Sequence, residues 1–273
     1  MNKGTISVEF YVGRYIYLSG LLSTIPDVRF GGRGSRESIS VYTVNNKTGQ
    51  RDRLRITNTS PKWDHYYELA VRRERVKEQL NLLLSSWSED YKGSLAKISS
   101  EYIIIPNDVN RYDCDCWNLF KSNDCDVQNK YPVRYKDFIM RSYFEVEVAK
   151  VLDSLGIDYK YEVRLPIGGG DEISPDMAVN LPEYNRCGFV EALGGLDSLK
   201  YVSHNTWKLK GYINCGLYPN RDVALVSADS KVVPTRDMIK RMIGTMLSYI
   251  ASQYVMKKSL FNSVCVDSYV DSF

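Results

Sequence analysis

The chain has 273 residues, of which 44% are hydrophobic, 25% charged and 12% aromatic. This composition excludes a chain that is disordered throughout, and its longest apolar runs are too short to span a bilayer, so we expect no membrane partner. The net charge of +3 hides an asymmetry, because residues 1–100 carry 16 Lys and Arg against 10 Asp and Glu, which favours a polyanionic partner for this third of the chain.

Alternating apolar residues open the chain. Ile6, Val8 and Phe10 alternate with other residues and predict a strand that continues to residue 18. A second strand is predicted over 39–43.

A basic strand follows the turn at residues 45–49. Arg51, Arg53 and Arg55 are spaced two apart, so a strand would place all three guanidinium groups on one face. Residues 63–87 then carry a helical apolar stripe, and residues 102–105 predict a short strand. We interpret residues 1–105 as a β-rich, basic N-terminal domain.

Three cysteines lie in a polar stretch, residues 106–136, that we interpret as a linker or insertion. Because no secretory leader is recognisable, we expect a reduced protein of the cytoplasm, or a phage- or virus-encoded one acting in the host cytoplasm. Cys114, Cys116 and Cys125 leave a zinc site open, but only three ligands are local, and a structural zinc site needs four.

A second unit spans residues 137–273. Its patterns predict, in chain order, a helix ending at Gly156, three strands, a helix over 198–215, a strand over 222–226 and a helix over 235–254. This order indicates an α/β (α+β) class with a mixed sheet flanked by helices. The glycines at 168–170 predict a loop near the edge of the candidate site. The sequence does not fix the oligomeric state, and a homo-oligomer is compatible with it.

Three acidic residues of the second unit occupy informative positions. Asp176 begins one predicted strand, Glu191 lies within the next, and Glu145 lies on the preceding helix. Paired strands bring Asp176 and Glu191 together, and two adjacent carboxylates repel each other unless a positive group lies between them. Oxygen ligands favour Mg²⁺, or Mn²⁺, over Zn²⁺.

The following helix supplies a basic residue. Tyr201, Lys208 and Tyr212 are seven and four residues apart, so they share one helix face. Lys208 is therefore predicted to point back at the acidic pair, where an ammonium group would stabilise phosphoryl charge.

These residues resemble the PD-(D/E)XK nuclease superfamily and its restriction-endonuclease-like fold. The resemblance rests on Ser174-Pro175-Asp176 and on Phe189 to Gly194, and covers residues 138–228. The commonest form has Lys two positions after the Glu, where this chain has Leu193. A variant that ends this strand as Glu-x-x-Gly and takes its lysine from the next helix matches Glu191 to Gly194 and Lys208.

The resemblance implies a Mg²⁺-dependent endonuclease that hydrolyses phosphodiester bonds. Asp176, Glu191 and the carbonyl of Ala192 would hold the metal, Glu145 a second metal or a water, and Lys208 would offset charge at the phosphate. Glu162 is a weaker candidate, Glu147 could replace Glu145 if the helix were rotated, and His204 shares the face of Lys208.

The expected substrate is nucleic acid, with DNA favoured over RNA. The contact residues that we predict are Arg14, Arg33, Arg36, Arg51, Arg53, Arg55, Tyr201 and Tyr212. Two alternatives stay open. One is an inactive protein of this fold that binds nucleic acid or serves as an assembly subunit. The other is a viral or structural protein whose first unit contacts other proteins.

Overall fold

The structure is a computed structural model that describes residues 5–31, 36–44, 48–106, 112–122, 132–168, 171–229 and 232–261. The helices are α1 (Val8–Thr24), α2 (Trp63–Asp90), α3 (Leu95–Ser99), α4 (Cys114–Leu119), α5 (Tyr143–Ser154), the short 3-10 helix η1 (Pro182–Tyr184), α6 (Leu199–Asn214) and α7 (Arg236–Tyr254). The strands are β1 (Asp27–Phe30), β2 (Ser38–Val44), β3 (Arg51–Thr57), β4 (Tyr102–Ile104), β5 (Val133–Tyr135), β6 (Phe138–Met140), β7 (Tyr159–Tyr161), β8 (Leu165–Gly168), β9 (Asp171–Ile173), β10 (Met177–Leu181), β11 (Arg186–Leu193), β12 (Val223–Ser227) and β13 (Val255–Lys257).

A mixed four-stranded sheet, in the order β12-β11-β10-β7, forms the centre of the second unit. The pairs β11–β10 and β10–β7 are antiparallel, whereas β11 and β12 are parallel and are joined by α6. Both faces of this sheet are covered, which is why its strands are apolar runs. The mixed α+β class predicted from the sequence is confirmed.

The two faces of the sheet belong to different buried clusters. Val179 and Val190 face a large cluster that includes residues of α5 and α7, whereas Ala178 and Phe189 face a smaller one that includes Tyr212 of α6. Because side chains alternate along a strand, Asp176 lies on the same face as Ala178, and Glu191 on the same face as Phe189. Both carboxylates therefore project on the α6 side of the sheet.

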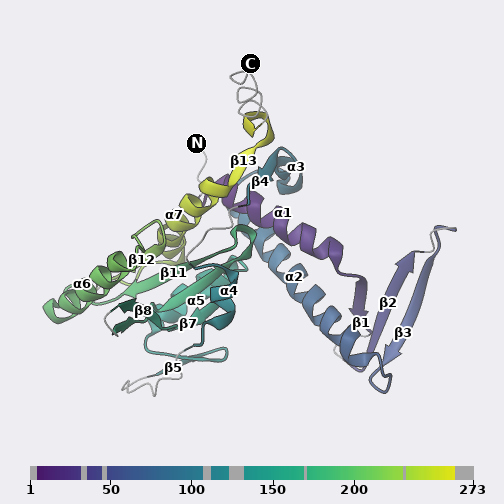
Figure 1. The fold of residues 1–273 in the computed structure, drawn as a ribbon, viewed down its shortest axis with the longest axis horizontal. Helices are drawn as coiled ribbons and strands as arrows, with labels where there is room; N and C mark the ends of the chain where they lie inside the picture. Colours follow the sequence, from purple (N-terminus) through teal and green to yellow (C-terminus); the bar gives the residue numbers. More distant parts are fainter. Residues whose placement is uncertain are drawn as a thin grey trace.

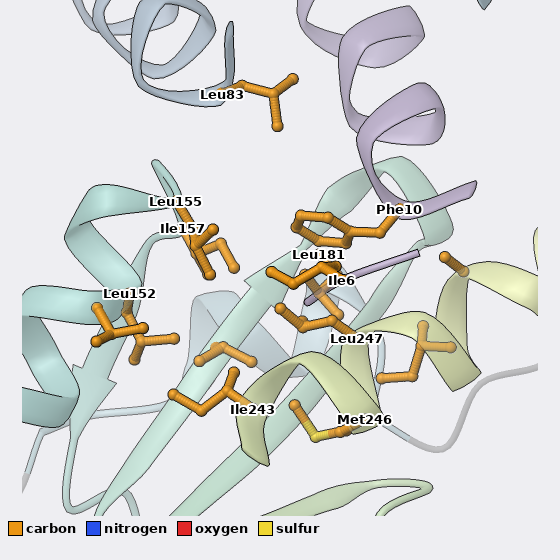
Figure 2. Close-up of a cluster of buried hydrophobic side chains, with 14 of the residues drawn as sticks. Ile6, Phe10, Leu83, Leu152, Leu155, Ile157, Leu181, Ile243, Met246 and Leu247 are labelled. Carbon is orange, nitrogen blue, oxygen red and sulfur yellow. The ribbon is translucent and has the colours of Figure 1, made fainter. Parts of the chain in front are cut away.

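The first helix corrects the sequence analysis, because residues 8–24 form α1 and not strands. The side chain of Ser7 caps the helix by accepting a hydrogen bond from the amide of Phe10. Ile6 and Phe10 are buried with Leu181 of β10 and Leu247 of α7 (Figure 2). The apolar alternation that suggested a strand is therefore the surface of a helix buried on several sides, where tertiary packing outweighs strand propensity.

The core does not stop at the domain boundary predicted near residue 105. Phe10 of α1 and Leu83 of α2 belong to the same buried cluster as Leu152 of α5 and Ile243 of α7 (Figure 2). The boundary itself stays a prediction. The sheet β1-β2-β3 has a small core of its own, formed with the start of α2 and centred on Ile39.

The β1-β2-β3 sheet forms an arm. It lies at the far end of α1 and α2 from the central sheet, and α6 lies at the opposite end of the long axis of the molecule (Figure 1). In the part of the chain that the structure describes, no helix is long and apolar enough to cross a membrane.

Most other predicted elements of the second unit are present. Of the three glycines predicted to form a loop, Gly168 is the last residue of β8, and Gly169 and Gly170 lie outside the described residues. Cys114 and Cys116 are on α4, whereas Cys125 lies outside the described residues, so the zinc alternative stays a prediction. Cys187 and Cys215 are buried, as expected of small core residues.

Candidate active site

The register of β10 and β11 places the two predicted carboxylates side by side. Met177 pairs with Val190, so Asp176, which directly precedes β10, lies opposite Glu191. The amide of Ala192 donates a 2.7 Å hydrogen bond to Oδ2 of Asp176. Both carboxyl groups are buried, and the backbone of the hairpin fixes their separation.

Lys208 of α6 reaches this pair, as its helical spacing predicts. Its Nζ donates a hydrogen bond to Oε1 of Glu191 and lies 3.9 Å from Oδ1 of Asp176. Burial acts to lower the pKa of Lys208, but the charges of Asp176 and Glu191 outweigh it and the pKa is raised. The side chain is therefore a cation held between two carboxylates.

Tyr212 also belongs to this cluster, but not in the role predicted for it. Its hydroxyl donates a 2.6 Å hydrogen bond to Oε2 of Glu191, and its side chain is fully buried. A side chain without exposed surface cannot contact nucleic acid. Tyr212 orients Glu191 instead, so its assignment as a nucleic-acid contact is wrong.

Glu145 is present beside the pair, but its oxygens are engaged locally. Ser142 caps α5, and its hydroxyl donates to Oε1 of Glu145 over 2.9 Å, while the amide of Arg141 donates to Oε2 over 3.1 Å. Tyr161 adds a 2.6 Å hydrogen bond to Oε2. Ser142 and Glu145 have the spacing of a capping box, although Glu145 accepts from the amide one residue before the N-cap, and these contacts give Glu145 a structural role. Its helical neighbour Glu147 is directed elsewhere, toward Lys150 and Arg236.

Glu162 is a third carboxylate at this end of the central sheet, beside Asp176 and Glu191. Its amide donates a 3.0 Å hydrogen bond to the carbonyl of Asp176, and its carboxylate pairs with Arg141 at 2.8 Å. The backbone of Glu162 has φ of 45°, a strained conformation for a residue with a side chain, of a kind that clusters at functional sites. The structure thus gives more support to Glu162 as a residue of the site than the sequence did, where it was a weaker candidate.

The electrostatics of the cluster show a surplus of negative charge. The cluster contains four buried carboxylates and only two basic side chains. The carboxylates are those of Glu145, Glu162, Asp176 and Glu191, and the basic side chains are those of Lys208 and Arg141. Burial raises the pKa of all four carboxyl groups. For Glu191, burial and then the charge of Asp176 raise the pKa to about 7.

A metal ion would fit this chemistry, although the full predicted ligand set is not assembled. Among the described residues, no group of three or more His, Cys, Asp or Glu side chains is arranged to hold a metal ion. The remaining donors, Asp176 and Glu191, are hard oxygen ligands, and the Ala192 carbonyl is adjacent in sequence. Buried, under-compensated carboxylates of this kind favour Mg²⁺ or Mn²⁺.

Three of the carboxylates, Glu145, Asp176 and Glu191, line a cleft of about 540 Å³. Its walls come from the start of α5, the end of β11 and one face of α6; the lining residues from α6 are Tyr201, His204, Asn205 and Lys208. Tyr201 is 58% exposed, so of the two tyrosines predicted to contact nucleic acid it is the accessible one. Sequence reasoning missed Asn205, although its position next to His204 on the predicted helix face could have indicated it.

The predicted arginine contacts divide into three groups. Arg51, Arg53 and Arg55 are exposed on β3, and Arg36 is exposed near the same arm. Arg14 is buried in an ion pair with Glu183, so its assignment as a nucleic-acid contact is wrong. Arg33 lies outside the described residues.

The raised carboxyl pKa values predict a pH-dependent stability. A carboxyl group whose pKa is higher in the folded state binds its proton more tightly there, so it adds stability below its unfolded pKa near 4.5 and loses it as the pH rises to about 7. Without divalent cations we therefore expect the free energy of unfolding to fall by on the order of 1–3 kcal/mol between roughly pH 5 and pH 8.

Urea unfolding in EDTA measures this change, and Glu191→Gln should flatten it. Lys208 does not oppose it, because its raised pKa lies above this pH window. A stability that rises from pH 5 to pH 8 would contradict the charge surplus described above.

Comparison with models of protein families, with curated proteins and with solved structures finds no match to this chain. The geometry of the cleft is therefore the guide to function.

Proposed function

We propose that this protein is a metal-dependent nuclease that hydrolyses phosphodiester bonds of nucleic acid, with DNA favoured over RNA and an endonuclease favoured over an exonuclease. One observation carries the proposal. The Lys208 ammonium group lies between Asp176 and Glu191, and all three line one cleft. These residues come from separate elements, and their sequence pattern resembles the PD-(D/E)XK superfamily.

The metal would be held by Asp176, Glu191 and the carbonyl of Ala192. When bound, Mg²⁺ or Mn²⁺ would supply Lewis-acid activation of water and of the phosphate at neutral pH. This is the cofactor implied by the oxygen donors and by the surplus of negative charge.

The side chains of the chain itself contribute orientation and charge. Tyr212 and Lys208 hold the two oxygens of Glu191, which keeps the carboxylate in one orientation without a bound ligand. The side chain of Lys208 is only 12% exposed and is positioned before substrate arrives, so its ammonium group can offset negative charge that develops on the phosphate. Arg141, half exposed and paired with Glu162, adds a second basic group at the wall of the cleft.

The direct test is cleavage of plasmid and of single-stranded DNA, with RNA as a third substrate. We expect cleavage that requires Mg²⁺ or Mn²⁺ and stops when EDTA is added. Binding of nucleic acid without cleavage under all metal conditions would overturn the nuclease proposal and favour the non-catalytic assembly role.

The arm supplies a separate basic surface. The register of the β1-β2-β3 sheet places four arginines on the same face as Ser40 and Tyr42. They are Arg29, Arg51, Arg53 and Arg55. One carboxylate, that of Asp27, binds Arg29 and Arg51, and also Arg73, so positive charge remains in excess on this face. A one-sided arginine surface suits phosphate contacts.

We expect replacement of Arg51, Arg53 and Arg55 by Ala to weaken nucleic-acid binding. The apparent Kd should rise on the order of tenfold, and the slope of log Kd against log salt should fall by about two to three. Turnover at saturating substrate should change little, because the arm lies at the opposite end of the molecule from α6 (Figure 1), and α6 lines the cleft.

Fluorescence anisotropy across a salt titration measures both quantities. Arg241→Ala, which removes an exposed arginine of α7, is the matched control and should leave the slope unchanged. An unchanged slope in the triple variant would remove the arm from the interface.

A further inference from the structure

One face of α6 extends the catalytic cluster toward the mouth of the cleft. Tyr201, His204, Asn205 and Lys208 all line the cleft, and their spacing places them on one side of the helix. The first turns of α6 are exposed on most sides, and the helix lies at the edge of the molecule (Figure 1). This part of α6 is therefore held out over the cleft and not packed into the core.

Asn205 is the unusual residue on this face. Its side chain is only 9% exposed, and its Nδ2 has no hydrogen-bond partner among the described residues. Buried amide donors are nearly always paired, because an unpaired one costs free energy. An unpaired donor in the wall of a cleft is explained if a ligand accepts its hydrogen bond.

The neighbouring aromatic rings indicate what kind of ligand enters. Tyr201 is 58% exposed and Trp207 48% exposed, and the rings of His204 and Trp207 are stacked, with centroids 6.1 Å apart and planes inclined by 26°. These rings do not contribute to a buried cluster. Exposed aromatic side chains beside a cleft that also holds Lys208 and Arg141 are typical of surfaces on which nucleobases stack.

The depth of Asn205 favours an unpaired nucleotide over a duplex. Bases in a duplex are stacked on each other and present only their edges in the grooves, so they cannot stack on a protein ring at the same time. A base must leave the stack to enter a pocket. Lys208 and Arg141 lie in the same cleft and complement the charge of the adjoining phosphate.

We propose that this face of α6 is a subsite for an unpaired nucleotide of a single-stranded nucleic acid. The base stacks on Tyr201 and His204, and Nδ2 of Asn205 donates a hydrogen bond to the nucleotide. This inference rests on the proposed nuclease function for its place beside the scissile phosphate, and it names the substrate class of that site.

The test measures binding under conditions that do not require cleavage. A short fluorescein-labelled oligothymidylate is titrated into the protein with Ca²⁺ in place of Mg²⁺, and the same strand paired with its complement is the comparison. We expect the single strand to bind about tenfold more tightly, Asn205→Ala to weaken this binding by about tenfold, and Tyr201→Ala to weaken it by a similar factor. With unlabelled oligothymidylate, tryptophan emission should be quenched, and Trp207→Phe should remove that quenching.

The controls separate binding from folding. Asn214→Ala removes an exposed amide at the other end of α6 and should bind like the unchanged protein. Thermal unfolding of Asn205→Ala should occur at an equal or higher temperature, because the variant loses an unpaired buried donor.

The outcomes also separate this inference from the nuclease proposal. Single-strand preference without Mg²⁺-dependent cleavage would support the subsite and overturn the nuclease. Cleavage with equal affinity for single strand and duplex, or with Asn205→Ala unaffected, would overturn the subsite and leave the nuclease standing.

Discussion

Glu191→Gln is expected to reduce Mg²⁺-dependent cleavage by on the order of 10³-fold, or about 4 kcal/mol of transition-state free energy. The substitution removes one negative charge from the centre of the cluster and changes little volume. Lys208 would then lie beside a neutral amide and retain only Asp176, at 3.9 Å, as a charged partner. Both the metal affinity and the placement of the ammonium group should suffer.

The fold should survive this substitution, which makes the loss of activity interpretable. In the absence of metal and near pH 8, Glu191 carries a negative charge, and its burial disfavours this charge and so raises its pKa. Glu191→Gln should therefore be at least as stable as the unchanged protein under those conditions. Glu172→Gln on β9, an exposed carboxylate paired with Arg164, is the matched control. Single-turnover cleavage within a few-fold of the control would contradict the role of Glu191.

The central part of the candidate site could be predicted because its geometry is local. Asp176 and Glu191 belong to neighbouring strands joined by a short turn, so hairpin register alone brings them together. Lys208 lies on the next helix, and its spacing from Tyr201 and Tyr212 fixes the helix face. Each step crosses a short sequence distance, where periodicity is a reliable guide.

The parts that the sequence could not give depend on distant contacts. Residues 8–24 alternate like a strand but form a helix, because α1 is enclosed by segments distant in the chain, as shown by the hydrogen bond between Tyr11 and Ser86, which are 75 residues apart. Burial of Tyr212 follows from the packing of α6 on the sheet. Periodicity shows which residues share a face, but not which end of that face reaches solvent.

Two residues of the site were ranked low or missed for a similar reason. Glu162 is made conspicuous by its positive φ and by its pairing with Arg141, and neither is encoded in a short motif. Asn205 is made conspicuous because its Nδ2 has no hydrogen-bond partner among the described residues, and only the three-dimensional structure can reveal this. The contacts of both residues depend on the three-dimensional structure and cannot be read from the local sequence.

Arg14→Met is expected to destabilise the protein by about 3–5 kcal/mol, because it leaves Glu183 buried without its partner. The side chain of Arg14 is 2% exposed, and its Nη1 lies 3.0 Å from Oε2 of Glu183. Its Nη2 donates to the carbonyl of Gly156 at the end of α5. A single side chain of α1 thus ties η1 and α5 together.

The double variant Arg14→Met with Glu183→Leu separates the ion pair from packing. Apolar residues of similar size remove both charges together, so the double variant should recover most of the stability lost by the single one. Arg29→Met, which breaks an exposed pair with Asp27, is the control and should cost about 1 kcal/mol or less. Urea unfolding measures all of them. If Arg14→Met lowered the free energy of unfolding no more than this control does, the ion pair would not be structural. If the folded double variant bound nucleic acid more weakly than the unchanged protein, Arg14 would be a nucleic-acid contact after all.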